Sequence, residues 1–140
     1  MDERILARLR DACASSPVRF AIVFGSRAAG RPRPDSDLDI GLWPASPDMP
    51  LRDELELASA LSAAAGMEVD LVRLDRDDPL LGREVARDGI CLYERTKGAC
   101  ASYRARAMSW WADFDETIAP HRERMLRRLA EGARDQRGPR

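Results

Sequence analysis

Hydrophobic residues follow two periodicities along the chain, that of a helix and that of a strand. Apolar positions recur every three or four residues over 3–14, 51–65, 80–88 and 99–119, which predicts amphipathic helices. Apolar β-branched runs or strict alternation over 18–24, 37–43, 68–74 and 90–93 predict strands. Pro120 interrupts the last helix, and a weaker helical stretch follows. This order predicts one α/β (α+β) domain, with a small sheet of about four strands flanked by helices.

The strand predicted over 37–43 has an apolar face and an acidic face. Leu38, Ile40 and Leu42 point to one side of the sheet, and Asp37 and Asp39 point to the other. Two neighbouring carboxylates repel each other, and a divalent cation relieves that repulsion. Taken alone, the pair also fits two aspartates on a solvated sheet face.

Two further features strengthen the metal interpretation. Asp70 supplies a third carboxylate from a separate predicted strand, and three carboxylates can hold a metal pair that clamps both oxygens of an in-line displacement. Gly25 and Ser26 end the first predicted strand, where backbone N–H groups and a hydroxyl suit a phosphate. A Gly-Ser turn by itself remains an ordinary turn.

The combined motif is more specific than its parts. Gly25-Ser26, ten intervening residues and Asp37-x-Asp39 resemble the G-S-x10-D-x-D signature of the DNA polymerase β-like nucleotidyltransferase superfamily. Asp88-Gly89-Ile90-Cys91-Leu92-Tyr93 is similar to the last strand of its minimal, MNT-type members. The resemblance implies a mixed sheet, a nucleotidyltransferase core over residues 1–95, and a C-terminal helical extension with a basic tail over 96–140.

The resemblance also assigns roles to individual residues. Asp37, Asp39 and Asp70 would hold two catalytic Mg²⁺ ions, and Asp70 would help to activate the attacking hydroxyl. Gly25 and Ser26 would hold the phosphates of an NTP. Arg27 would touch a phosphate, although a surface arginine is an equally good interpretation.

MNT-type proteins work as antitoxins beside a HEPN-domain RNase toxin and transfer AMP from ATP onto a toxin tyrosine. The resemblance therefore implies an ATP-using protein adenylyltransferase in a hetero-oligomer with a HEPN toxin. Two alternatives stay open: a non-catalytic antitoxin of the same fold, and a nucleotidyltransferase acting on a small molecule or an RNA end. The crowded carboxylates favour catalysis over binding alone. A length of 140 residues leaves no room for a large second domain that would hold a small-molecule acceptor, which favours a macromolecular acceptor.

Composition limits the kinds of binding partner and the cellular compartment that we expect for this protein. The net charge is -1, and no apolar run approaches the roughly 20 residues of a membrane span, so we expect neither membrane insertion nor direct nucleic-acid binding. Three cysteines without a CxxC pair and no secretory signal predict reduced thiols in a cytoplasmic protein. His121 is interpreted as a surface residue.

Two features of the C-terminal third leave their interpretation open. Arginines dominate from Arg122 onward, which indicates an acidic partner, nucleic acid, or a solvated helix face with a frayed end. Aromatic residues gather in the predicted helix over 99–119, where Trp110 and Trp111 are adjacent and point about 100° apart. They either complete the core or form part of an interface.

Overall fold

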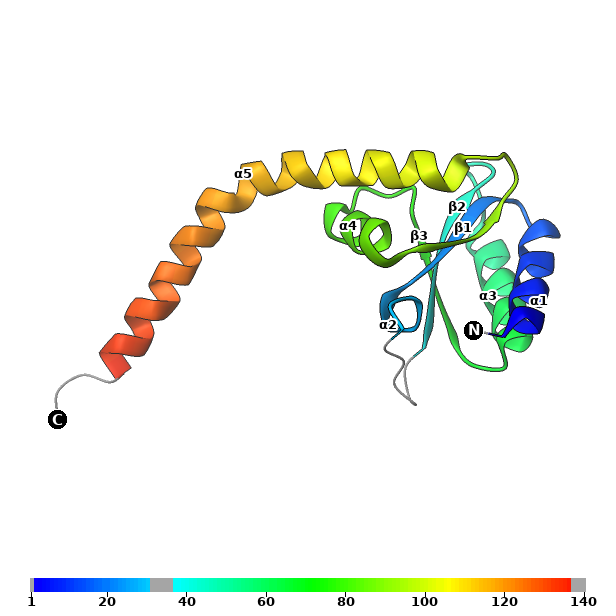
Figure 1. The fold of residues 1–140 in the computed structure, drawn as a ribbon, viewed down its shortest axis with the longest axis horizontal. Helices are drawn as coiled ribbons and strands as arrows, with labels where there is room; N and C mark the ends of the chain where they lie inside the picture. The colour runs from blue at the N-terminus through cyan, green and yellow to red at the C-terminus, as the bar shows by residue number, and fades with distance from the viewer. Residues whose placement is uncertain (1, 31–36, 137–140) are drawn as a thin grey trace.

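The computed structural model describes residues 2–30 and 37–136, with side chains described as far as residue 133. The elements follow the predicted order closely (Figure 1). They are α1 (Glu3–Ala14), β1 (Val18–Phe24), α2 (Gly25–Ala28), β2 (Leu38–Pro44), α3 (Leu51–Ala65), β3 (Val69–Arg73), α4 (Pro79–Asp88), β4 (Ile90–Glu94) and α5 (Ala99–Gln136). Local chemistry sets several helix ends: Asp2 and Asp78 cap α1 and α4 with their side chains, and Gly66 ends α3 at a φ of 69°.

The four strands form one mixed sheet in the order β3-β2-β1-β4. β1 is antiparallel to both β2 and β4, whereas β2 and β3 are parallel and are joined by the crossover helix α3. This confirms the expected mixed sheet and supplies the pairing that the sequence left open. The parallel register places Asp39 of β2 directly beside Asp70 of β3.

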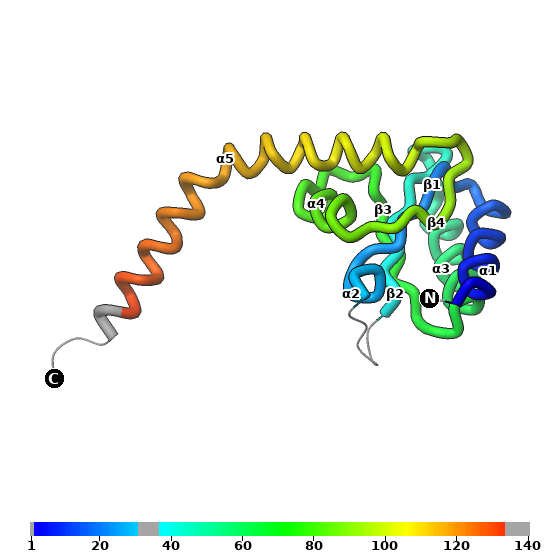
Figure 2. Tube along the Cα trace, viewed as in Figure 1, coloured from blue at the N-terminus to red at the C-terminus, as the bar shows by residue number. Residues whose placement is uncertain are grey.

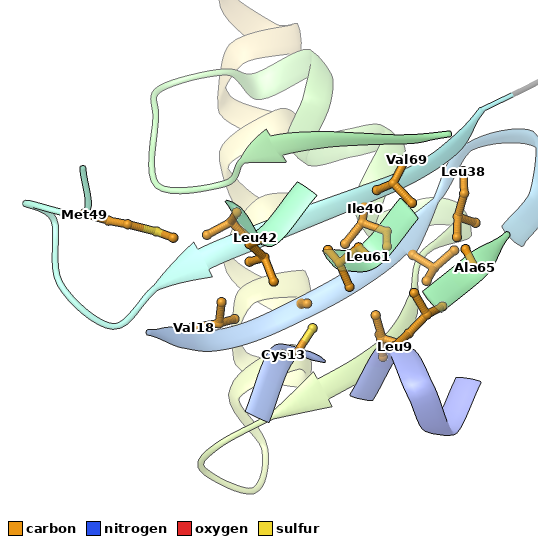
Figure 3. Close-up of a cluster of buried hydrophobic side chains, with 14 residues drawn as sticks. Leu9, Cys13, Val18, Leu38, Ile40, Leu42, Met49, Leu61, Ala65 and Val69 are labelled. Carbon is orange, nitrogen blue, oxygen red and sulfur yellow. The ribbon is translucent and has the colours of Figure 1, made fainter. Parts of the chain in front are cut away.

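Helices cover both faces of the sheet, and the alternation along the strands sorts the core into two clusters. Leu38, Ile40 and Leu42 face α1 and α3, where they pack with Leu9 and Leu61 (Figure 3). The opposite face packs against α4 and α5 through Phe20, Ile22, Phe24, Leu74, Val85, Ala86, Cys100, Tyr103 and Ala107. Asp39 alternates with the first set, so it lies on the face that α4 covers.

Helix α5 is continuous from Ala99 to Gln136 and contains Pro120. The predicted interruption is therefore wrong: the proline leaves the helix whole. Figures 1 and 2 show that α5 bends where its colour passes from yellow to orange. A proline removes one backbone hydrogen bond and crowds the carbonyl four residues earlier, which bends a helix without ending it. Beyond the bend, α5 runs clear of the body (Figure 2).

The cysteines also differ from expectation. Cys91 on β4 and Cys100 in the first turn of α5 form a disulfide, with their Cα atoms 5.9 Å apart. The tight connection between β4 and α5 brings the two positions together, and a separation of nine residues in sequence does not reveal this. Cys13 remains a thiol in the core, where burial raises its pKa to about 12. Within the described part of the chain, no helix combines the length and apolar character that crossing a bilayer requires.

Candidate nucleotide and metal site

The candidate site lies where β1 ends and β2 and β3 begin. Asp39 is opposite Phe24 at the end of β1 on one side and opposite Asp70 on the other. Asp37 lies one residue before β2 and is exposed, Asp70 is exposed, and Asp39 is half-buried between its neighbours. Because adjacent strands are about 4.8 Å apart, the register alone makes the carboxylates of Asp39 and Asp70 neighbours. The structure thus brings together the three aspartates that the sequence singled out.

The Gly-Ser turn adjoins these carboxylates. Gly25 follows β1 directly and has a φ of 79°, in the left-handed region that glycine tolerates best. A Cβ atom built on Gly25 would collide with Oδ2 of Asp39. Glycine is therefore favoured at this position for two reasons: it tolerates the left-handed backbone angle, and it leaves space for the carboxylate of Asp39. Ser26 and Arg27 follow in the single turn of α2 and are both half-buried.

The electrostatics of Asp39 reflect this crowding. Partial burial raises the pKa of its carboxyl above the ordinary value, and the nearby charges of Asp70, Glu84 and Asp37 raise it further. Each of these neighbours is acidic, so the site concentrates negative charge. Such a site favours a cation, and hard carboxylate oxygens are the ligands that Mg²⁺ prefers.

The spacing of the ligand atoms refines this picture. Among the described residues, Cys91, Glu94 and Cys100 are the group of three candidate ligands whose donor atoms lie within 4.8 Å of one another. That group already has a structural role, because the two sulfurs are bonded and Glu94 accepts hydrogen bonds from the backbone N–H groups of Gly98 and Cys100. The three aspartates are neighbours, but their oxygens do not all lie within that distance of one another.

Glu84 is the acidic neighbour that sequence reasoning missed. It lies on α4, and its charge reaches Asp39 because α4 packs beside α2 and the end of β1. No motif contains Glu84, and the helix predicted over 80–88 gave no indication of which of its residues faces the sheet. Only the tertiary placement of α4 reveals it.

The aromatic residues of α5 serve mainly to attach the helix. Tyr103 is buried against Phe20 and Trp43, with ring centroids 5.6 and 6.1 Å away. Trp110 and Trp111 are both half-buried, and Trp111 lies 5.7 Å from Phe114 between ring centroids. His121 is exposed, as predicted.

A strand-end Gly-Ser turn beside three carboxylates on a mixed sheet is the arrangement that the sequence motif predicted for a nucleotidyltransferase. Consistent with this, residues 8–98 match the family described as polymerase beta, nucleotidyltransferase. Since the match covers well over half of the chain, this protein belongs to the polymerase beta nucleotidyltransferase family. Among curated proteins, none matched the chain.

Solved structures extend the likeness beyond the core. A chain of a toxin–antitoxin complex with AMP-PNP superposes with a TM-score of 0.72 at 21% identity, over 90% of this chain and 99% of that chain. A chain of the complex of tri-AMPylated Shewanella oneidensis HEPN toxin with MNT antitoxin gives a TM-score of 0.64 at 22% identity, over 87% and 92%. A chain described as a minimal nucleotidyltransferase shares 37% identity over 64% of this chain and 95% of its own, with a TM-score of 0.53.

Proposed function

We propose that this protein is a Mg²⁺-dependent nucleotidyltransferase that transfers AMP from ATP onto a tyrosine of a HEPN-domain toxin and thereby acts as its antitoxin. One observation carries the catalytic half of the proposal: Asp39 and Asp70 face each other across parallel strands, and Gly25 packs against Asp39. This crowding raises the pKa of the Asp39 carboxyl through burial and through the charges of Asp70, Glu84 and Asp37, and a bound divalent cation would offset it.

In this proposal Asp37, Asp39 and Asp70 hold a pair of Mg²⁺ ions, which supply charge neutralisation and alignment of the phosphates. The raised pKa of Asp39 is consistent with this role, because a bound cation would offset the repulsion that raises it. Glu84 on α4 adds negative charge near Asp39.

The nucleotide side of the site is the turn that follows β1. Gly25 and Ser26 would contact the phosphates of ATP, with Arg27 in the same turn as a further phosphate contact. The position of Gly25 supports this: its left-handed backbone brings the turn against Asp39, so that phosphates bound there lie beside the metal ligands.

The proposed reaction is a substitution at the α-phosphorus of ATP. The phenolic oxygen of the acceptor tyrosine forms a bond to the α-phosphorus, the bond from that phosphorus to the bridging oxygen breaks, and pyrophosphate leaves. Asp70 would accept the phenolic proton, since it is the exposed member of the facing pair. The structural neighbours support the acceptor class, because one of them is a complex with a tri-AMPylated HEPN toxin.

The test uses α-labelled ATP, Mg²⁺ and the HEPN-domain protein encoded beside the gene of this chain. Wild type is compared with Asp37→Asn/Asp39→Asn and with a control, Asp48→Asn/Asp77→Asn, which removes two exposed aspartates elsewhere. We expect label on the HEPN protein with wild type and control, and none with the site variant. If the site variant labelled the HEPN protein as fast as wild type, the assignment of the metal ligands would be wrong.

A second outcome separates the alternatives. If the two proteins form a tight complex and wild type transfers no label, the protein is a binding antitoxin without catalysis. Label that appears on RNA added to the same reaction, with none on the HEPN protein, would instead identify an RNA end as the acceptor.

A further inference from the structure

The part of α5 beyond the body carries an apolar face that nothing in the described chain covers. Every residue from 120 to 133 is exposed. Met125, Leu126 and Leu129 have exposed fractions of 63%, 60% and 64%, which is unusual for three large apolar side chains so close together. With Ile118 they follow helical spacing, and we call these four residues the distal stripe.

The distal stripe continues a face of α5 that is packed closer to the body. Trp111 and Phe114 precede Ile118 at spacings of seven and four residues, so they lie on the same side of the helix. There the face has a cover: the guanidinium of Arg83 on α4 lies 4.9 Å from the centre of the Trp111 ring. The part of this apolar face near the body thus packs against α4, and the part beyond the end of α4 has no such contact in the described chain (Figure 1).

Arginines outnumber acidic residues on this part of α5, and Arg122 and Arg128 lie beside the stripe at helical spacing. From 120 to 133, α5 has four arginines, Arg122, Arg124, Arg127 and Arg128, against Glu123 and Glu131. Closer to the body, a hollow of about 610 Å³ lies between α4 and α5 and is lined by Arg83, Ala86, Arg87, Arg104, Met108 and Trp111. Met108 is 54% exposed there. Two separate observations therefore indicate one surface, apolar along its centre and basic at its margins.

This surface has a defined relation to the carboxylates. Arg83 in the hollow and Glu84 near Asp39 are consecutive residues of α4, so the hollow and the site lie on different sides of that one helix. A helix is about 10 Å across. Figure 1 also shows that α5 inclines, beyond its bend, toward the side of the molecule where α4 and α2 lie.

We infer that the distal stripe and the hollow between α4 and α5 form the docking surface for the acceptor protein, through an acidic face of that protein with apolar residues at its centre. This inference rests on the proposed function for the identity of the partner. The arginines fit an acidic partner, and Met and Arg are enriched in protein interfaces. An acceptor that reaches into the hollow lies across α4 from Glu84, which is the residue of that helix whose charge acts on Asp39.

The test compares two triple variants of α5. Met125→Ser/Leu126→Ser/Leu129→Ser removes the stripe, and Glu123→Ser/Arg127→Ser/Ala130→Ser places as many serines on the opposite face without changing the net charge. Affinity for the neighbouring HEPN-domain protein is measured by calorimetry. We expect the stripe variant to bind at least about 30-fold more weakly, because interface truncations at apolar anchors are worth 2 kcal/mol or more. The control should stay within about twofold of wild type.

Two further measurements distinguish a loss of docking from a loss of nucleotidyl transfer and from misfolding of the variant. Arg128→Glu reverses a charge beside the stripe without touching the core, and it should weaken binding most at low salt if the partner is acidic. At saturating HEPN protein the stripe variant should label at the wild-type rate, since its metal and nucleotide residues are intact. Binding by wild type without labelling would refute the transfer and leave the docking surface standing.

Other outcomes would overturn the docking surface. Unchanged affinity in the stripe variant would refute it, even if labelling by wild type confirmed the proposed function. If the chain alone sedimented as a dimer that the stripe variant abolished, with affinity for the HEPN protein unchanged, the occupant of the stripe would be a second copy of this chain.

Discussion

Charged side chains gather at both ends of the parallel pair β2 and β3, and the two ends differ in how those charges are partnered. Where the strands begin, Asp39 and Asp70 face each other, with Asp37 and Glu84 nearby and only repulsion among them. Where β3 ends, Arg73 is 9% exposed and is held by Glu54 at 2.7 Å and by Asp75 at 2.6 Å. Two further carbonyl oxygens, of Met49 and Pro47, accept hydrogen bonds from the same guanidinium.

The pKa values follow the same contrast. Hydrogen bonds from Arg73 lower the pKa of Asp75 below its ordinary value, whereas burial and like charges raise the pKa of Asp39. Arg73 pairs with the carboxylates at one end, whereas at the other end burial and neighbouring carboxylates disfavour the charged form of Asp39. Under the proposed function, the paired end serves the structure and the end with Asp39 serves the reaction.

The largest expected effect is on transfer. Asp39→Asn should reduce nucleotidyl transfer about 10³-fold, which corresponds to about 4 kcal/mol of lost transition-state stabilisation from a displaced metal. The matched variant Asp75→Asn should keep the wild-type rate per folded molecule, because Asp75 lies at the other end of the strands. Transfer rates of both variants are measured with α-labelled ATP. Equal losses of transfer rate in Asp39→Asn and Asp75→Asn would show that the two ends of the strands do not differ in function.

The next effect is on stability. Arg73→Met should lower the free energy of unfolding by about 3 kcal/mol, because it leaves the largely buried Glu54 and Asp75 without their cation. Arg122→Met breaks the exposed pair with Asp115 and should change stability by less than about 0.5 kcal/mol. Urea unfolding of both variants tests this, and a small loss in Arg73→Met would show that the network does not hold the fold.

Two glycines sharpen the comparison further. Gly25→Ala and Gly66→Ala both force alanine into the left-handed region, so each should cost about 1 kcal/mol of stability. Only at Gly25 does the new Cβ meet the carboxylate of Asp39, whereas nothing lies within 4 Å of a Cβ at Gly66. Transfer should therefore fall in Gly25→Ala alone, and wild-type transfer in that variant would contradict the close approach.

The smallest effect is the pH dependence of stability without metal. The raised pKa of Asp39 contributes stability below its unfolded value of 3.8, and this is lost as pH rises through the folded pKa. Asp75 behaves oppositely, because its lowered pKa contributes stability above 3.8 that is lost as pH falls. Near neutral pH, Asp39→Asn should be at least as stable as wild type and Asp75→Asn less stable, with both differences shrinking on acidification. Urea unfolding between pH 3 and 8 tests both signs, with pH values chosen to bracket ordinary carboxyl titration.

The sequence predicted the elements and the three aspartates because both follow from local spacing. Alternation placed Leu38 and Asp39 on opposite faces, and the Gly-Ser motif marked the turn at Gly25. The parallel pairing that sets Asp39 beside Asp70 depends on the crossover through α3, which periodicity does not encode.

The features that the sequence did not predict are contacts between distant segments. Glu84 reaches Asp39 only because α4 packs beside α2, and Cys91 meets Cys100 only because the chain turns tightly after β4. Pro120 was expected to interrupt α5, but a proline costs one hydrogen bond, which a long helix can lose and still continue. The sequence leaves the role of the C-terminal arginines open, and the structure adds that Met125, Leu126 and Leu129 are exposed on the same part of α5.

The central claim is that the crowded end of β2 and β3 holds a divalent cation together with a nucleotide. Calorimetric titration of Mg²⁺ with a non-hydrolysable ATP analogue into wild type, Asp39→Asn and Asp75→Asn tests it most directly. The claim predicts saturable binding by wild type and Asp75→Asn, with affinity at least about 100-fold lower in Asp39→Asn, or about 2.7 kcal/mol. Binding by Asp39→Asn that equals wild type, or no binding by wild type, would contradict it.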